Sequence, residues 1–190
     1  MKQIQPAYRS KLAIAETLAA LGARAVTISA VAKTVPADSR DIYKQVNNAL
    51  SPSGQTPKDH QWFLANRTRR LHGAALLLLY CTYRSGYQSM APHDAHGLAF
   101  AMSLMTYREL NQVPPDGEPL VSPERFSLLV TNGYQFGWES IIRGAASNFV
   151  SDNVKVMKCR SCRTPHLTEA HYVKYECSAC VEAKEARSAL

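Results

Sequence analysis

Residues 159–180, CRSCRTPHLTEAHYVKYECSAC, decide the architecture of the C-terminal part because they contain two Cys-x-x-Cys pairs. The pairs are Cys159/Cys162 and Cys177/Cys180, and fourteen residues separate them. In a reducing cytosol, four thiolates at this spacing predict a tetrahedral zinc site rather than disulfides. Four protein sulfurs fill the coordination shell, so one structural Zn²⁺ is expected. A redox dithiol, or cysteines without a shared role, are the alternatives.

Two segments next to these pairs alternate apolar and polar residues with the period of a β-strand. They are NVKVMK (153–158), which precedes the first pair, and HYVKYE (171–176), which precedes the second. A strand ending at each pair is typical of a zinc ribbon. Two histidines, His166 and His171, lie between the pairs, and we expect both on the surface because four cysteines already complete the shell.

The sequence contains no pattern that indicates an enzyme. The His-x-Glu and Pro-Cys-x-x-Cys motifs of zinc deaminases are absent, as is a glycine-rich phosphate loop. The fifth cysteine, Cys81, lies in an apolar run and is expected to be a small buried side chain. Polar residues that suit a helix N-terminus better than a metal site are His93, Asp94 and His96.

Length and charge suggest one domain of ordinary size with a small appendage. The chain has 190 residues, of which 46% are hydrophobic, and a net charge of +7. Residues 1–75 hold eleven Lys/Arg against four Asp/Glu, residues 76–152 four against seven, and residues 153–190 seven against four. Basic ends favour contact with an anionic polymer, and an acidic middle favours a core or a protein partner. Ordinary solvated surface charge is the alternative.

The N-terminal segment predicts a cytoplasmic protein that does not contact a membrane. Charged residues interrupt residues 1–20, MKQIQPAYRSKLAIAETLAA, so they lack the apolar region of a secretory signal. The longest apolar run, residues 73–83, is much shorter than the ~20 residues that cross a bilayer. This run is expected to be a buried helix.

A helix-turn-helix is predicted by VAKTVPADSRDIYKQV, residues 31–46. We expect the turn at Pro36, with Asp38 or Ser39 capping the second helix. The apolar positions that would face inward are Val31, Ala32, Val35, Ala37, Ile42 and Val46.

The outward residues of the second helix are candidates for DNA contact, and they are Ser39, Arg40, Tyr43, Lys44 and Asn47. Arg40 and Lys44 are one helical turn apart, so both could face a phosphate or a guanine edge from the same side. In the ribbon, candidates for phosphate contact are Lys158, Arg160, Arg163 and Lys174. Helix pairs that never bind DNA are common, and such a pair is the alternative.

Three further helices are predicted after an exposed linker, SPSGQTPKDH (51–60). Their ranges are 62–86, 93–110 and 122–144. Arginines near the start of the first of them either contact phosphate or face solvent at its end, and they are Arg67, Arg69 and Arg70.

The predicted fold class is mainly α, a helical domain with a helix-turn-helix-like N-terminal part and a small C-terminal zinc ribbon with four cysteine ligands. The predicted parts are a DNA-binding part at 1–50, the linker at 51–60, a helical core and partner-binding part at 61–150, and the zinc ribbon at 151–190.

The order of these features resembles the FlhC family, subunits of the master transcription activator of the bacterial flagellum. The resemblance rests on LGARAVTISAVAKTVPADSRDIYKQV (21–46), a Ser-Pro linker leading to WFL, an apolar helix, GYQFGWESIIRG (133–144) and the cysteine pairs. It covers about residues 10 to 182.

The resemblance implies a cytoplasmic transcription activator that forms a heterohexamer with an FlhD partner, binds promoter DNA of flagellar operons and helps to recruit RNA polymerase. It also implies a structural Zn²⁺ on the four cysteines. The alternative function is a zinc-ribbon adaptor that binds protein partners without recognising DNA directly.

Overall fold

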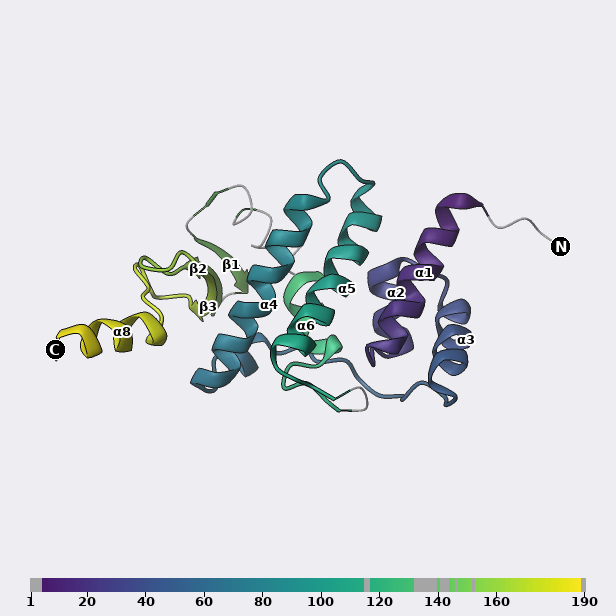
Figure 1. Ribbon diagram of the computed structural model, residues 1–190, viewed down its shortest axis with the longest axis horizontal. Helices are drawn as coiled ribbons and strands as arrows, with labels where there is room; N and C mark the ends of the chain where they lie inside the picture. The colour runs from purple at the N-terminus through teal and green to yellow at the C-terminus, as the bar shows by residue number, and fades with distance from the viewer. Residues whose placement is uncertain are drawn as a thin grey trace.

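The computed structural model describes residues 5–114, 117–131, 140, 144–145, 147–151 and 153–188. The described chain is mainly helical and carries a small three-stranded sheet and a four-cysteine cluster near its C-terminus, which confirms the predicted fold class (Figure 1). None of its helices is long and apolar enough to cross a membrane.

The N-terminal part consists of three helices that pack on one another, α1 (Pro6–Ala20), α2 (Ala25–Ala32) and α3 (Pro36–Asn47). Both α1 and α3 have proline in their first turn, where the missing N–H costs no helical hydrogen bond. Between α1 and α2 the chain turns at Gly22, whose φ of 85° is accessible to glycine without strain. The helix-turn-helix order is therefore present.

The turn between α2 and α3 lies at residues 33–35 rather than at Pro36. Lys33 has a left-handed conformation, with φ 57°, and ends α2, whereas Pro36 already belongs to α3. The fixed φ of proline suits this first helical position. The expected side-chain cap is also absent, because the N-cap is Val35 and neither Asp38 nor Ser39 occupies that position.

The middle of the molecule is a helical hairpin of α4 (Arg67–Gly86) and α5 (Pro92–Leu110), which lie side by side in Figure 1. The preceding 3-10 helix, η1 (His60–Phe63), holds residues that were expected at the start of α4. A new helix begins because the Asn66 side chain accepts a hydrogen bond from the backbone N–H of Arg69, at 2.9 Å. Of the helix predicted at 122–144, the structure shows α6 (Pro123–Thr131); residues 132–139 and 141–143 lie outside the described residues.

One hydrophobic core runs through nearly all of these elements. Its largest fully buried side chains include Phe63, Tyr80, Phe100, Tyr107 and Phe126. The same core extends from the N-terminal helices into the C-terminal sheet, reaching from Ile14 to Leu167.

The segment 51–60 is mostly irregular, and hydrogen bonds attach it to the start of α2. The Ser51 hydroxyl accepts a hydrogen bond from the N–H of Ala25 at 2.9 Å, and the Arg24 guanidinium donates to the carbonyl oxygen of Gln55 at 3.3 Å. The backbone N–H of Arg24 donates a hydrogen bond to the Glu124 carboxylate at 2.9 Å. These bonds hold the N-terminal helices, the 51–60 segment and α6 together.

The sheet has the order β1-β2-β3 and is antiparallel throughout. Its strands are β1 (Ser147–Ser151), β2 (Val154–Lys158) and β3 (Pro165–Glu169). The prediction of a strand at 153–158 is confirmed, but that of a strand at 171–176 is wrong, since this stretch is a loop. The register pairs Val154 with Glu169 and Lys158 with Pro165, so the hairpin closes directly around the first cysteine pair.

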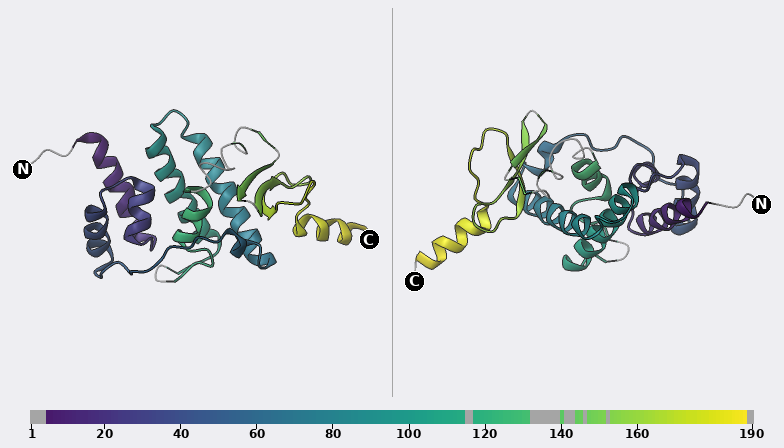
Figure 2. Two further views of the ribbon diagram at one scale, coloured as in Figure 1. Left: turned by 180° about the vertical axis from the view of Figure 1, so that it is seen from behind. Right: turned by 90° about the horizontal axis from the view of Figure 1, so that it is seen from above.

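A last helix, α8 (Ser178–Ser188), begins directly after Cys177, contains Cys180 and has no buried residue. It projects away from the body of the molecule (Figure 2). The two views show α3 and α8 near opposite ends of an elongated molecule, with the α4 and α5 hairpin between them.

Candidate metal centre and basic surfaces

The four cysteines meet at one point, although they come from two different structural elements. Cys159 and Cys162 lie in the β2–β3 loop, while Cys177 precedes α8 and Cys180 lies in its first turn. Their sulfur atoms all lie within 4.8 Å of one another, and the sulfurs of Cys162 and Cys177 are 3.9 Å apart. A tetrahedral ion with Zn–S bonds of about 2.3 Å needs sulfurs about 3.8 Å apart, whereas a disulfide needs about 2 Å. The cluster could therefore hold one metal ion.

Backbone hydrogen bonds shape the first cysteine pair into a tight turn. The N–H of Cys159 donates to the carbonyl oxygen of Thr164, and the N–H of Arg163 donates back to Cys159, both at 2.9 Å. The positive φ of Arg163, 63°, lets the chain reverse within this short loop. A bond of 3.0 Å from the N–H of Arg160 to the carbonyl oxygen of Tyr175 links this turn to the segment that carries the second pair.

The electrostatics of the sulfurs favour a bound cation. Burial raises the pKa of Cys159, but N–H groups of Cys177, Cys162 and Ser161 outweigh it and lower that pKa to about 6. In the opposite direction, the neighbouring Cys177 side chain, with burial, raises the pKa of Cys180 to about 12. Thiols crowded in this way resist joint ionisation until a cation displaces their protons, so metal binding must release protons.

A small apolar cluster surrounds the sulfurs, formed by Met157, Cys159, Tyr175 and Cys177. His166 lies against the Tyr175 ring and is 2% exposed, so the expectation of a surface His166 is wrong. Its strand, β3, packs against α4, and burial lowers the pKa of His166 to about 4. His171 is exposed as expected and stacks on Tyr172.

The second helix of the helix-turn-helix presents two free cations to solvent. Arg40 and Lys44 are exposed and form no ion pair with any residue that the structure describes. Tyr43 is half-buried against the core, and the Asn47 amide donates to the carbonyl oxygens of Ala19 and Tyr43, both at 3.2 Å. Of this group, Arg40 and Lys44 are therefore the cations most available to an anion in solution.

Ser39 lies inside the molecule, so it does not face outward as the sequence suggested. Its hydroxyl is 2.7 Å from that of Thr34 and donates to the carbonyl oxygen of Val35 at 3.2 Å. The buried side of α3 is narrow, since only Ser39 and Ile42 are buried in it. As a result, three residues expected to face inward are exposed, and they are Val35, Ala37 and Val46.

The ribbon cations differ in their availability. Arg163 and Lys174 are exposed, and Lys158 is half-buried. The Arg160 guanidinium pairs with the Glu176 carboxylate at 3.1 Å, which neutralises part of its charge. Arg163 and Lys174 are therefore the freer candidates for phosphate contact.

Two arginines of α4 bind the C-terminal part, which the sequence did not reveal. Arg67 pairs with Glu182 of α8 at 2.6 Å, and Arg70 pairs with Glu169 of β3 at 2.9 Å. These partners are 115 and 99 residues away in sequence, so no local pattern could have identified them.

The histidines of α5 do not form a second metal site. Among the residues that the structure describes, the four cysteines are the one group with metal-binding geometry. His96 instead shares a hydrogen bond of 2.6 Å with the Tyr80 hydroxyl.

No protein-family model matches this chain, and a search of curated proteins finds no significant match.

Proposed function

We propose that this chain is the DNA-binding subunit of a cytoplasmic transcription activator. It would act with an FlhD-type partner in a hetero-oligomer, bind promoter DNA of flagellar operons and help to recruit RNA polymerase. The observation that carries the proposal is the exposed Arg40 and Lys44 pair on the second helix of a helix-turn-helix. This helix type lies in the major groove in many regulators, where Arg and Lys read guanine or contact phosphate.

Charge at the other end of the molecule supports the same proposal. Arg163 and Lys174 lie in or near the cysteine-bearing loops and are exposed. A structural Zn²⁺ would hold these loops in place, because a hairpin this small has little core of its own. The ribbon would thus add phosphate contacts, which position a protein on the duplex without reading its sequence.

An apolar groove between α1 and α5 supports a protein partner. The groove has a volume of about 390 Å³. Its lining includes Met90, Leu98, Met102 and Met105. Methionine side chains adapt to varied apolar surfaces, which suits a subunit interface.

The test is a fluorescence-anisotropy titration of a flagellar-promoter duplex, with and without FlhD, at two salt concentrations. We expect tight, sequence-selective binding that improves with FlhD, and log K that falls by about 0.9 per phosphate contact for each unit of log salt. Arg40→Ala/Lys44→Ala should abolish selective binding while zinc content stays unchanged. The matched control for Lys44→Ala is Lys58→Ala, which removes an exposed cation from the 51–60 segment.

An adaptor that binds only proteins is the second candidate. It is favoured by the mixed charge of the ribbon, where Glu176 pairs with both Arg160 and Lys184. Folded, zinc-loaded protein that binds no duplex at either salt concentration, with or without FlhD, would support the adaptor and reject the activator.

A further inference from the structure

Two guanidinium groups lie against one tryptophan ring in the middle of the molecule. Trp62 belongs to η1, Arg69 to the first turn of α4, and Arg125 to the first turn of α6. The guanidinium carbon of Arg69 is 4.4 Å from the centre of the Trp62 ring, and that of Arg125 is 4.1 Å from it. An indole attracts cations to its face, so the ring holds both guanidiniums in fixed positions.

Neither of the two guanidiniums forms an ion pair with a carboxylate in the part of the chain that the structure describes, in contrast to Arg67 and Arg70 of α4. Burial and the positive charge of Arg69 lower the pKa of Arg125, and Asp59 acts in the opposite direction. The two neighbouring cations repel each other, and an anion bound beside them would relieve that repulsion.

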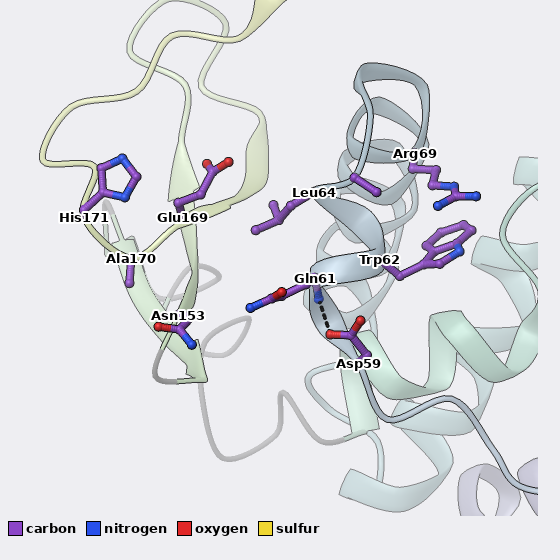
Figure 3. A pocket seen from close by; sticks show the side chains of 10 residues that line it. Asp59, Gln61, Trp62, Leu64, Arg69, Asn153, Glu169, Ala170 and His171 are labelled. Carbon is purple, nitrogen blue, oxygen red and sulfur yellow. Dashed lines mark hydrogen bonds between the residues drawn. The ribbon is translucent and has the colours of Figure 1, made fainter.

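A cavity of about 800 Å³ lies beside this cluster, with Trp62 and Arg69 in one wall and His171 in the wall formed by the ribbon (Figure 3). Two carboxylates also line the cavity. Asp59 accepts a hydrogen bond from the N–H of Gln61 at 2.8 Å and keeps its charge, whereas Glu169 pairs with Arg70. The guanidinium that a ligand in this cavity could reach is that of Arg69.

We propose that Arg69, Arg125 and Trp62 form a binding site for the phosphodiester backbone of nucleic acid. Guanidinium binds phosphate oxygens through paired N–H donors, and Trp62 fixes the orientation of both groups in advance. Because the guanidiniums lie against the ring, Trp62 acts by positioning them and not by stacking on a base. This inference rests on the proposed function and adds a phosphate contact in the body of the molecule, on helices that lie between α3 and the ribbon (Figure 1).

The experiment compares Arg69→Gln/Arg125→Gln with the full-length parent in anisotropy titrations of a promoter duplex and an unrelated duplex over a range of salt. We expect the slope of log K against log salt to fall by roughly 2, at about 0.9 for each lost phosphate contact. Affinity for both duplexes should fall at least about tenfold, because phosphate contacts are blind to sequence. Arg9→Gln/Arg187→Gln removes two exposed arginines, one of α1 and one of α8, and should keep most of the parental slope.

A second readout follows Trp62 directly. In a Trp138→Phe background, Trp62 is the sole tryptophan, because the chain has two. Its fluorescence should change as duplex is added and lose that response in the double Gln variant. Arg69→Lys/Arg125→Lys keeps the charge and should retain much of the salt slope, which guards against loss of binding through misfolding.

The outcomes separate this site from the proposed function. Selective promoter binding with an unchanged salt slope in the Gln variant and a silent Trp62 would overturn the site and leave the activator standing. Loss of binding in the Gln variant, from a parent that binds every duplex alike, would keep the site and reject sequence-specific activation. A folded parent that binds no duplex would reject both.

Discussion

His96 illustrates how the packing of single residues in α5 makes stability depend on pH. Its Nδ1 atom shares a hydrogen bond with the Tyr80 hydroxyl, and its Nε2 atom is buried without a partner in the described structure. Burial lowers the pKa of His96 to about 4, and the charges of Lys33, Arg84 and His93 act in the same direction. The folded state therefore holds this ring neutral.

The stability of the protein should fall on acidification because of this histidine. An unfolded chain binds a proton near pH 6.5, whereas the folded chain binds it only near pH 4, so unfolding becomes favoured as pH falls through this window. The group should cost about 2 kcal/mol of stability between pH 7.5 and pH 5. Urea unfolding of His96→Asn should show a flatter acid dependence than the parent.

The matched control for this experiment is His93→Asn, an exposed histidine of the same helix. It removes only the smallest of the charges that act on His96, so its slope should stay much closer to the parental slope than that of His96→Asn. Equal slopes for the parent and His96→Asn would show that His96 does not titrate as its burial requires.

At the scale of elements, the contact between α4 and η1 depends on one glycine. A Cβ atom added at Gly73 would lie 2.7 Å from the Phe63 ring, which is fully buried. Gly73→Ala should therefore lower the free energy of unfolding by about 1–3 kcal/mol, measured by thermal or urea unfolding. In the same helix, Gly86→Ala meets no atom within 4 Å and should be neutral or slightly stabilising. Similar stabilities for the two variants would mean that η1 shifts at little cost.

Local patterns predicted the elements whose signals are local. The apolar periodicity of residues 93–110 predicted a helix whose bounds agree with those of α5 within one residue. The two Cys-x-x-Cys spacings predicted a four-cysteine site, and the four sulfurs do lie together. The helix-turn-helix order could also be predicted, because a proline such as Pro36 marks a helix boundary and apolar residues occur at helical spacing before and after it.

Features that depend on which segment or side chain becomes the partner could not be predicted in this way. Residues 171–176 alternate like a strand, yet β2 pairs with Pro165–Glu169, since the hairpin closes around the nearer cysteine pair. Val173 is 86% exposed as a result. Ser39 has the polarity of a surface residue, but it is buried and the Thr34 hydroxyl, five residues away, satisfies its hydrogen bond. In both cases the partner is nearby in the chain, but the polarity pattern does not identify it.

At the scale of the whole molecule, the sheet belongs to the main core while the cysteines form a core of their own. Val154, Val156 and Leu167 of β2 and β3 pack in the cluster that extends to the N-terminal helices. Met157, Cys159, Tyr175 and Cys177 form the separate cluster around the sulfurs. Metal removal should therefore act on only part of the ribbon.

We expect a chelator to raise amide hydrogen exchange in residues 159–164 and 171–188, which include α8, while β2, β3 and the helices α1 to α6 stay protected. Cys177→Ser should lose the metal and give the same pattern, whereas Cys81→Ala should keep the metal content of the parent. Loss of protection in β2 and β3 as well would show that the metal supports the sheet, and no change anywhere would argue against a metal site.

The continuous core also fixes the distance between the two basic ends of the molecule. In an activator of the proposed kind, α3 and the ribbon could not slide independently along a duplex, because packed helices separate them. DNA repeats its face about every 10 base pairs. Changing the spacing of two contacted segments by half a turn would place one of them on the far side of the duplex, while a full turn would restore its direction but not its distance. Operators of such a protein would therefore tolerate base changes between the contacted segments far better than insertions.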